Sequence, residues 1–471
     1  MSRGASSARL LKNSFKYRTS FIANFHFLIL FIYALLWIEC LAKSFFFADD
    51  FTSLKFFWHD LKLNSGTSYN AGRYVTNLLF GLGSLIFGSG SSAPFEVLSG
   101  ITLVLGLWLI SFSIRKNAQA SLWGLQIFTI SLVYGGALPL LLWATGITHT
   151  ASSLFTGLAI FSFHLGLSKN DFSQRFVLTF VSGIFWFLVV LSDPLYVGVL
   201  CIALLNSLKF SNDARRLNVN FKFTKIFTVF AFNIFLPILY FFLVARPATV
   251  KMSPYSKIGI QFLNANLNFY KVNLFWNSSS KLIFILIILF TFIVAISTVR
   301  ISLRPFAFLS SGMITLGAIL IQGQQREVFY TVLPFTLILT SLTLGISHLK
   351  SVKIHKLYSP FLLVVTVVLL VSGSRQASFF NSEPWGYKLQ PLINEIAFNT
   401  APNKNLAICF SGTKDQFNEF IGSYGGSAAF EIPPVNALSV DLMLNSCSLS
   451  ANQVPLHIIE NQSGFFALIA K

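Results

Sequence analysis

The chain has 471 residues, of which 11% are charged and 54% are hydrophobic, and its mean hydropathy is +0.69. Soluble domains carry about 25% charged residues, so this composition excludes a soluble globular protein and predicts a polytopic membrane protein. The formal net charge of +18 does not indicate a nucleic-acid partner, because the basic residues concentrate in the loops on one side of the predicted membrane domain.

Apolar runs long enough to cross a bilayer, about 17–25 residues, recur along the first four-fifths of the chain. The first run is too long for a signal-peptide core and has no small-residue cleavage site behind it, so we expect a retained helix. A run at 73–90 is short and Gly-rich, and we expect it to lie on the outer face of the membrane or to dip into it. The eleven predicted spans are 21–42, 97–114, 120–140, 151–168, 176–192, 194–210, 226–245, 282–299, 306–323, 328–346 and 357–373.

The charge of the loops predicts the orientation of these spans. The loops on one side carry 19 of the 34 Lys and Arg residues, with Asp171 and Asp213 as their only acids. Because basic loops stay in the cytoplasm, we expect a cytoplasmic N-terminus and an external C-terminus. Residues 43–96 then form one long external loop.

Residues 1–373 are the predicted transmembrane domain, and residues 374–471 are expected to form a small α/β domain outside the membrane. In this second part, the sequence after Pro384 predicts an amphipathic helix. The segment "NLAICFSG" has the pattern of a buried strand. The segment "HIIENQSGFFALIAK" has the pattern of a hairpin with its turn at 461–464. Cys409 and Cys447 both fall here. They either form a disulfide, which suits an oxidising periplasm, or remain two free thiols.

Two adjacent carboxylates, Asp49 and Asp50, directly follow the first span in "FFFADDF". Ionisable groups at a membrane edge are rare unless they are functional. One carboxylate can act as a general base while the other orients it, the acceptor or a divalent cation such as Mg²⁺ or Mn²⁺. The alternative is that Asp50 caps a surface helix, which explains one carboxylate but not the pair.

Basic and aromatic residues mark the later external loops. The loop that contains Arg246 and Trp276 has no acid and suits a lipid head group or a sugar; alternatively it is an interfacial anchor. Arg326, in "GQQREVFY", offers a guanidinium that suits phosphate. Alternatively, Arg326 forms a surface ion pair with Glu327, or its long side chain extends along the helix to keep the guanidinium in water.

Two further polar residues are candidates for substrate contacts. Asp193 lies in "LSDPLYVG" between two closely spaced spans, where it either contacts substrate or caps the second helix. His149, in "WATGITHT", is a candidate contact to a sugar or a metal ion.

"FFFADDF" after the first span, with "YNAGRYVTNLLF" about twenty residues further on, resembles the Asp-Asp…Gly-Arg pattern of bacterial O-antigen glucosyltransferases of the Gtr type II group. More widely it is similar to GT-C membrane glycosyltransferases. The detailed resemblance covers roughly residues 20–115, and "GRYV" departs from the Gly-Arg-Pro expected there.

The resemblance implies an all-α GT-C-like fold and transfer of a hexose, glucose being the first candidate, from a polyprenyl-phosphate donor to a surface glycan such as lipopolysaccharide O-antigen. The reaction would take place on the periplasmic face of a bacterial inner membrane. Asp49 is the expected base and Asp50 its orienting or metal-binding neighbour. The residues expected at the donor phosphate are Arg73, Arg246, Arg326 and Tyr330.

Two other classes of function remain alternatives. O-antigen polymerases and ligases are also polytopic and lipid-linked, but they rely on Arg-rich late loops. A lipid or polysaccharide transporter or flippase should show midplane charges and broken helices in paired halves. The charges of this chain gather at the predicted outer edge, which favours the glycosyltransferase.

The charge distribution makes a topological prediction. Reporters fused after Arg115, Arg216 and Lys356 should read cytoplasmic, and a reporter fused after Arg375 should read periplasmic, because the positively charged loops are retained inside. Paired alkaline phosphatase and fluorescent-protein fusions measure this. A cytoplasmic signal from the Arg375 fusion would contradict the eleven-span arrangement.

Overall fold

The computed structural model describes most of the helical part of the chain and parts of the C-terminal segment. The described residues are 3–41, 74–87, 92–114, 118–135, 137–141, 146–216, 222–246, 259–266, 278–321, 328–349, 351–382, 393, 395–397, 405–410, 413, 435, 437, 439–445, 453–460 and 466–469.

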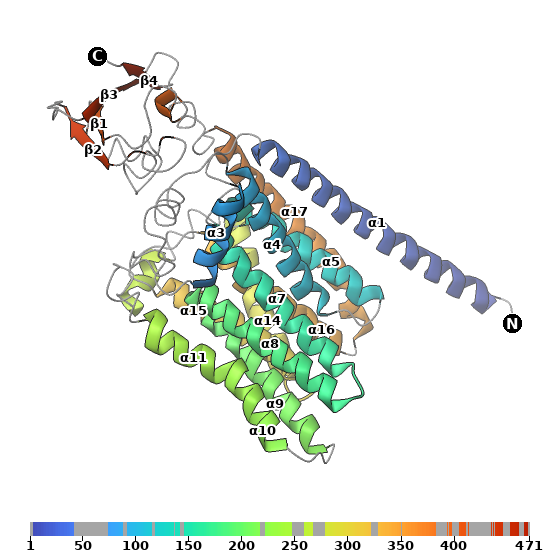
Figure 1. Cartoon of the computed structure of the whole chain (residues 1–471). Helices are drawn as coiled ribbons and strands as arrows, with labels where there is room; N and C mark the ends of the chain where they lie inside the picture. Colours follow the sequence, from blue (N-terminus) through green and yellow to red (C-terminus); the bar gives the residue numbers. More distant parts are fainter. Residues whose placement is uncertain are drawn as a thin grey trace.

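Helices make up residues 3–382 wherever they are described, apart from short connections (Figure 1). The α-helices are α1 (Arg3–Leu41), α3 (Tyr74–Phe87), α4 (Ala93–Phe112), α5 (Ala118–Val133), α6 (Ala137–Leu141), α7 (Ile147–Leu167), α8 (Phe172–Ser192), α9 (Leu200–Arg216), α10 (Lys222–Phe230), α11 (Leu236–Tyr240), α14 (Ser278–Thr298), α15 (Arg304–Leu320), α16 (Val332–His348) and α17 (Val352–Ser382). Short 3₁₀ or π segments are η3 (Pro194–Val199), η4 (Ala231–Phe235), η5 (Phe241–Ala245), η7 (Ile260–Phe262) and η8 (Val328–Thr331).

The apolar helices establish a multi-pass membrane protein. Within the described residues, seven helices are long and apolar enough to cross a bilayer: Ser20–Glu39, Ala93–Phe112, His149–Leu167, Phe172–Ser192, Pro194–Ala214, Phe223–Ala245 and Ile354–Val371. All seven coincide with predicted spans. The other four predicted spans fall on shorter apolar helices, namely Gln119–Val133, Ile285–Thr298, Arg304–Leu320 and Val332–His348. Eleven crossings therefore stay a prediction.

Helix α1 ends where α4 begins, at the same end of the bundle (Figure 1). Near the end of α1, the indole N–H of Trp37 donates to the carbonyl of Leu141 at 3.0 Å, and a Cβ added at Gly100 in α4 would collide with the Trp37 ring. Helix α3 lies against this end through Phe80 and Phe87, whose rings pack on Phe95. The end of α1, α3 and the start of α4 thus lie at the same end of the bundle.

A buried polar contact fixes the middle of α1 to its neighbours. His26 is fully buried, and its Nε2 lies 3.3 Å from the side-chain nitrogen of Gln126 in α5. Gln126 in turn donates to the carbonyl of Ser359 in α17 and accepts from the Ser359 hydroxyl. Because polar groups in an apolar interior are costly unless paired, this network joins α1, α5 and α17.

Helices α4 and α7 approach most closely at glycines. A Cβ added at Gly106 would lie 2.5 Å from the backbone nitrogen of Leu154, and one added at Gly157 would lie 2.8 Å from the carbonyl oxygen of Gly106. Lipid tails are as apolar as leucine, so membrane helices associate through close van der Waals packing, which small residues permit. This contact sets the spacing of the two helices.

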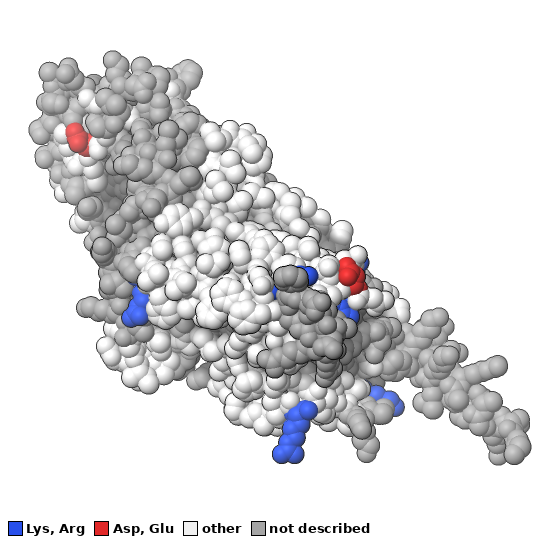
Figure 2. Space-filling model, turned by 60° about the horizontal axis from the view of Figure 1, so that its bottom comes forward, with Lys and Arg blue, Asp and Glu red and all other residues white. Residues whose placement is uncertain are grey.

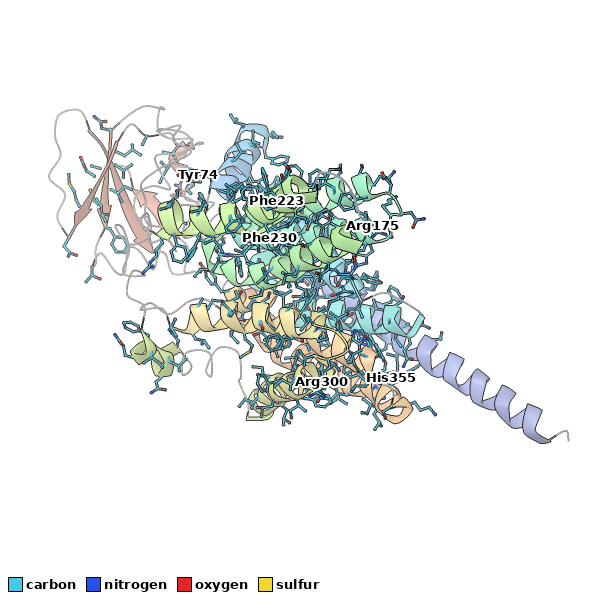
Figure 3. The ribbon with its side chains drawn as sticks, turned by 90° about the horizontal axis from the view of Figure 1, so that it is seen from below. Tyr74, Arg175, Phe223, Phe230, Arg300 and His355 are labelled. Carbon is cyan, nitrogen blue, oxygen red and sulfur yellow. The ribbon has the colours of Figure 1, made fainter. Side chains whose placement is uncertain are left out.

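The two ends of the bundle differ in charge. Figure 2 looks toward the end away from the sheet and shows Lys and Arg scattered over a mostly uncharged surface. In Figure 3, Arg175, Arg300 and His355 lie toward this end, whereas Tyr74 lies toward the sheet. Near this end, Lys225 lies over the ring of Phe172 at the start of α8, and Arg304 contacts His164 in the last turn of α7.

A four-stranded sheet follows the last helix, beyond the end of the bundle where α17 stops (Figure 1). Its strands are β1 (Asn405–Phe410), β2 (Ser439–Leu444), β3 (Gln453–Glu460) and β4 (Phe466–Ile469), in the order β2-β1-β3-β4. β1 is parallel to β2 and β3, and β3 is antiparallel to β4. The predicted buried strand and the antiparallel pairing of the predicted hairpin are confirmed, whereas β2 was not predicted. That residues 374–471 form a separate domain stays a prediction.

The cysteines are placed in part. Cys409 lies buried in β1 and is disulfide-bonded, and Cys201 in α9 is a free thiol. Cys447 lies outside the described residues, so its pairing with Cys409 stays a prediction.

The glycine contact makes a prediction about stability. Gly106→Ala should destabilise the folded protein by about 1–3 kcal/mol, because the new methyl group meets backbone atoms that cannot rotate away. Gly317→Ala in α15 is the matched control: nothing lies within 4 Å of its added Cβ, so the helix should gain up to about 1 kcal/mol. Thermal unfolding in detergent measures both. Equal shifts would contradict the role assigned to Gly106.

Candidate functional site

The predicted site residues fall into two groups. Asp49, Asp50, Arg73, Trp276 and Arg326 lie outside the described residues, so their roles stay predictions. His149, Asp193, Tyr330 and Arg246 are described. The structure brings the first three of these together at the end of the bundle where α1 ends and α4 begins.

Asp193 lies between α8 and η3, and its two carboxylate oxygens make two different contacts. Pro194 follows it and favours an extended backbone before it, which is the conformation Asp193 adopts. Its Oδ1 accepts from the backbone N–H of Leu195 at 3.0 Å, which caps η3. Its Oδ2 lies 2.9 Å from Nδ1 of His149, and the carboxylate is fully buried. Helix capping and a substrate contact were the alternatives in the sequence; the structure shows the cap, and the substrate contact stays a prediction.

His149 projects from the first turn of α7 and is 2% exposed. Its ring packs edge-on against Tyr330, with ring centroids 4.3 Å apart, and more distantly against Tyr196 at 6.3 Å. With Asp193 at Nδ1, the imidazole is held between a carboxylate and two tyrosine rings. The orientation of the imidazole is therefore set by contacts from two separate parts of the chain, residues 193–196 and Tyr330.

Tyr330 comes from η8, immediately before α16, and is 6% exposed. The next residue, Thr331, forms a 2.9 Å hydrogen bond between its hydroxyl and that of Tyr134 at the end of α5. The ring of Tyr134 also stacks on Phe335 in α16 at 4.5 Å. These contacts join η8 to α5 and so hold Tyr330 beside His149.

Hydroxyl groups support the first turn of α7 from the other side. The Thr150 hydroxyl lies 2.7 Å from that of Thr102 and 3.2 Å from that of Ser99, both in α4. Ser99 also donates to the carbonyl of Leu140 at 2.8 Å. Because Thr150 follows His149 directly, this network positions the backbone from which the imidazole projects.

The imidazole and the carboxylate lie within ion-pair distance, and they carry opposite charges when the imidazole is protonated. A carboxylate removed from water costs several kcal/mol unless a cation or hydrogen bonds compensate for it, and Asp193 receives the backbone N–H of Leu195 and the contact with the His149 ring. The arrangement can therefore donate hydrogen bonds and hold a proton at a position shielded from water.

Sequence reasoning missed several members of this cluster. Tyr196 lies three residues after Asp193, and Tyr134 and Thr331 are separated widely in the chain; only Tyr196 could have been found by its nearness to an acid. Glu96, in the first turn of α4, is also fully buried at this end of the bundle.

Arg246 is exposed and contacts none of the three clustered residues in the part that the structure describes.

The described side chains do not form a metal site. No group of three His, Cys, Asp or Glu residues among them is close enough to hold an ion. Asp50, the predicted cation ligand, lies outside these residues. The other histidine of α7, His164, contacts the guanidinium of Arg304 at the opposite end of the bundle.

Comparison with known proteins shows the fold. No family model matches the chain, and no curated protein matches it. The crystal structure of ArnT from Cupriavidus metallidurans bound to undecaprenyl phosphate matches with a TM-score of 0.51 at 10% identity, covering 88% of this chain and 90% of that chain. The apo structure of the same protein has a TM-score of 0.42 at 11% identity, covering 82% of both chains. The first match shows that this chain has the fold of ArnT.

The buried pair makes a prediction that a double-mutant cycle can measure. His149→Leu should destabilise the protein by about 3–5 kcal/mol, because it leaves the Asp193 carboxylate buried without its cation. The double variant His149→Leu/Asp193→Leu should recover part of this loss, since no buried charge remains. Unfolding midpoints in detergent report both. Strictly additive effects would mean that the two side chains do not interact.

Proposed function

We propose that the chain is a membrane glycosyltransferase that transfers a hexose from a polyprenyl-phosphate donor to a glycan acceptor. The observation that carries the proposal is the buried pair of His149 and Asp193 beside Tyr330, at one end of a membrane-embedded helical bundle. Such a site can donate hydrogen bonds to a leaving group whose lipid tail stays in the bilayer.

The fold supports this choice of donor. ArnT, whose fold this chain has, was crystallised with undecaprenyl phosphate. A polyprenyl phosphate combines a long apolar tail with an anionic head. Membrane helices with apolar flanks, ending in a polar cluster, offer matching surroundings for the two parts of this molecule.

The remaining roles follow from the sequence pattern. Asp49 is proposed as the base that takes the proton of the acceptor hydroxyl, and Asp50 as the neighbour that orients it or binds a divalent cation. Arg73, Arg246 and Arg326 are proposed to bind the donor phosphate together with Tyr330, and Trp276 to contact substrate. Glucose, an O-antigen acceptor and the periplasmic face of the inner membrane are the proposed sugar, acceptor and location.

The chemistry needs one displacement. The acceptor oxygen forms a bond to the anomeric carbon while the bond from that carbon to the phosphate oxygen breaks. The electron pair of the broken bond stays on the phosphate, and the hydroxyl proton goes to the base. A single displacement inverts the anomeric configuration.

Substitution of the acidic pair tests the function. Asp49→Asn keeps the size of the side chain and removes its basicity, so the transfer rate should fall by about 100- to 10,000-fold. Purified protein with polyprenyl-phosphate hexose and acceptor glycan, followed by the mass of the acceptor, measures transfer. Asp171→Asn is the control, because Asp171 caps α8 at the other end of the bundle and asparagine caps equally well.

Asp50→Asn should be run in parallel, together with Arg326→Ala. The arginine variant should raise the KM for the donor more than it lowers kcat, since a phosphate contact is already made in the ground state. Wild-type transfer by both aspartate variants would rule out catalysis by the acidic pair.

A further inference from the structure

We propose that the end of the bundle away from the sheet binds a phosphate group through Arg304, at the start of α15, and Arg300, in the turn before it. The phosphate belongs either to an anionic phospholipid head group of the adjacent leaflet or to an inorganic phosphate ion. This site lies at the opposite end of the bundle from His149 and Asp193, and it does not depend on the proposed function.

The first step of the argument concerns the charge of Arg304. The guanidinium, which is partly buried, contacts Nε2 of His164 in the last turn of α7 through its Nη2. A guanidinium has only donors and no acceptor, so the ring nitrogen accepts and the imidazole is neutral. The contact therefore satisfies one N–H of Arg304 but leaves its positive charge without a counter-charge.

The second step concerns the elements around Arg304. Helices α7, α14, α15 and α16 contain no Asp or Glu, and α16 reaches the first turn of α15 through Ser341, whose hydroxyl donates to the carbonyl of Pro305. Helix α9 also packs against α15. It contributes Asp213, but that carboxylate lies 3.8 Å from Arg175. Among the described carboxylates, none forms an ion pair with Arg304 or Arg300.

The third step concerns the helix terminus. The N-terminus of a helix carries a partial positive charge that favours anions, so a cation there is unfavourable. Arg304 is nevertheless the first residue of α15, and the N-cap, Leu303, makes no side-chain capping bond. The hydroxyl of Ser302 lies 3.3 Å from the backbone nitrogen of Arg304 and brings no negative charge. A bound phosphate would compensate both the guanidinium and the helix terminus.

The turn before α15 adds a second cation. The backbone N–H groups of Ile301 and Ser302 both donate to the carbonyl of Thr298 at 2.9 Å, which closes the turn that carries Arg300. Arg300 is exposed and lies toward the end of the bundle away from the sheet (Figure 3). Guanidinium groups bind phosphate oxygens with paired hydrogen bonds, so the two arginines supply the donors that a phosphate requires.

The side chains beside the arginines favour a lipid as the source of the phosphate. Ile301 is 63% exposed, Leu303 52% and Phe306 43%. A phospholipid combines an anionic head with apolar chains, and this surface offers two guanidinium groups next to exposed apolar side chains. An inorganic phosphate ion would use only the first of these features.

The experiment measures binding by the full-length chain, purified in detergent and freed of lipid. The probes are phosphatidylglycerol, phosphatidylcholine, whose choline cation neutralises its phosphate, and inorganic phosphate. Affinity follows from the rise of the unfolding midpoint with probe concentration, because a ligand that binds the native state stabilises it. Arg304→Gln should weaken binding of phosphatidylglycerol by about 10-fold or more, the usual effect of a lost charge-assisted hydrogen bond.

Three further variants complete the test. Arg304→Lys keeps the charge but loses the planar fork, so its affinity should fall between those of wild type and Arg304→Gln. Arg300→Gln changes an exposed turn residue and should give a smaller loss without affecting folding. Lys356→Gln is the matched control, because it removes one exposed charge from α17 at the same end of the bundle and should bind phosphatidylglycerol as wild type does.

Stability without lipid separates binding from a structural role. Arg304→Gln should not unfold at a lower temperature than wild type when no probe is present, because it removes a charge that its own helix terminus disfavours. A lower midpoint in the absence of lipid, with an unchanged rise on adding it, would assign Arg304 to the fold and overturn the inference.

The probes distinguish the two sources of phosphate. Loss of phosphatidylglycerol binding in Arg304→Gln, without competition from inorganic phosphate in the wild type, identifies a lipid head group, whereas competition identifies an inorganic phosphate site. Wild-type affinity of Arg304→Gln for every probe, or an equal loss in Lys356→Gln, would overturn the inference. Sugar transfer is not measured, so the result is independent of the glycosyltransferase proposal.

Discussion

The ion pair between His149 and Asp193 is the interaction on which the candidate site depends. A carboxylate buried in a membrane bundle is costly by itself, and the imidazole of His149 reaches Asp193 from another helix. This contact places the first turn of α7 against the junction of α8 and η3. That contact in turn puts the imidazole beside Tyr330, and it links three connections of the chain into one polar cluster.

Such a cluster is possible because the helices approach closely elsewhere. At the crossing of α4 and α7, glycines replace side chains with backbone contacts. Another close approach joins η3 to α15, where a Cβ at Gly198 would meet Thr315. In lipid, packing of this kind takes over the role that hydrophobic burial has in water. The polar groups at the end of the bundle are therefore positioned by apolar and small-residue contacts within it.

The two ends of the bundle have different chemical characters, and this difference bears on the proposed function. The end away from the sheet carries most of the described basic side chains, while the other holds the buried pair, the tyrosines and Glu96. If the basic end faces the cytoplasm, as charged loops do, the polar cluster faces outward.

The amino-acid sequence by itself determined the class of the protein, most of its helices and part of its sheet. Hydropathy is a property of consecutive residues, so a run such as 176–192 specifies a membrane helix whatever surrounds it. The terminal hairpin could be predicted for the same reason, because its strands are adjacent in the chain. Strand β2 was missed because its six residues, which end in three consecutive apolar side chains, lack a sustained alternation, and its partner β1 lies about thirty residues earlier in the chain.

Only the tertiary structure decided which polar residues meet. In the sequence, His149 was one of several polar residues at the outer edge, and Asp193 was as well explained by helix capping as by a substrate contact. Their pairing depends on how α7 crosses its neighbours, and the presence of Tyr330 depends on where η8 is held by Tyr134 and Thr331. These contacts join segments far apart in the chain, so no local sequence pattern predicts them. The acidic pair of Asp49 and Asp50, by contrast, was recognised from the sequence alone, and its role stays a prediction.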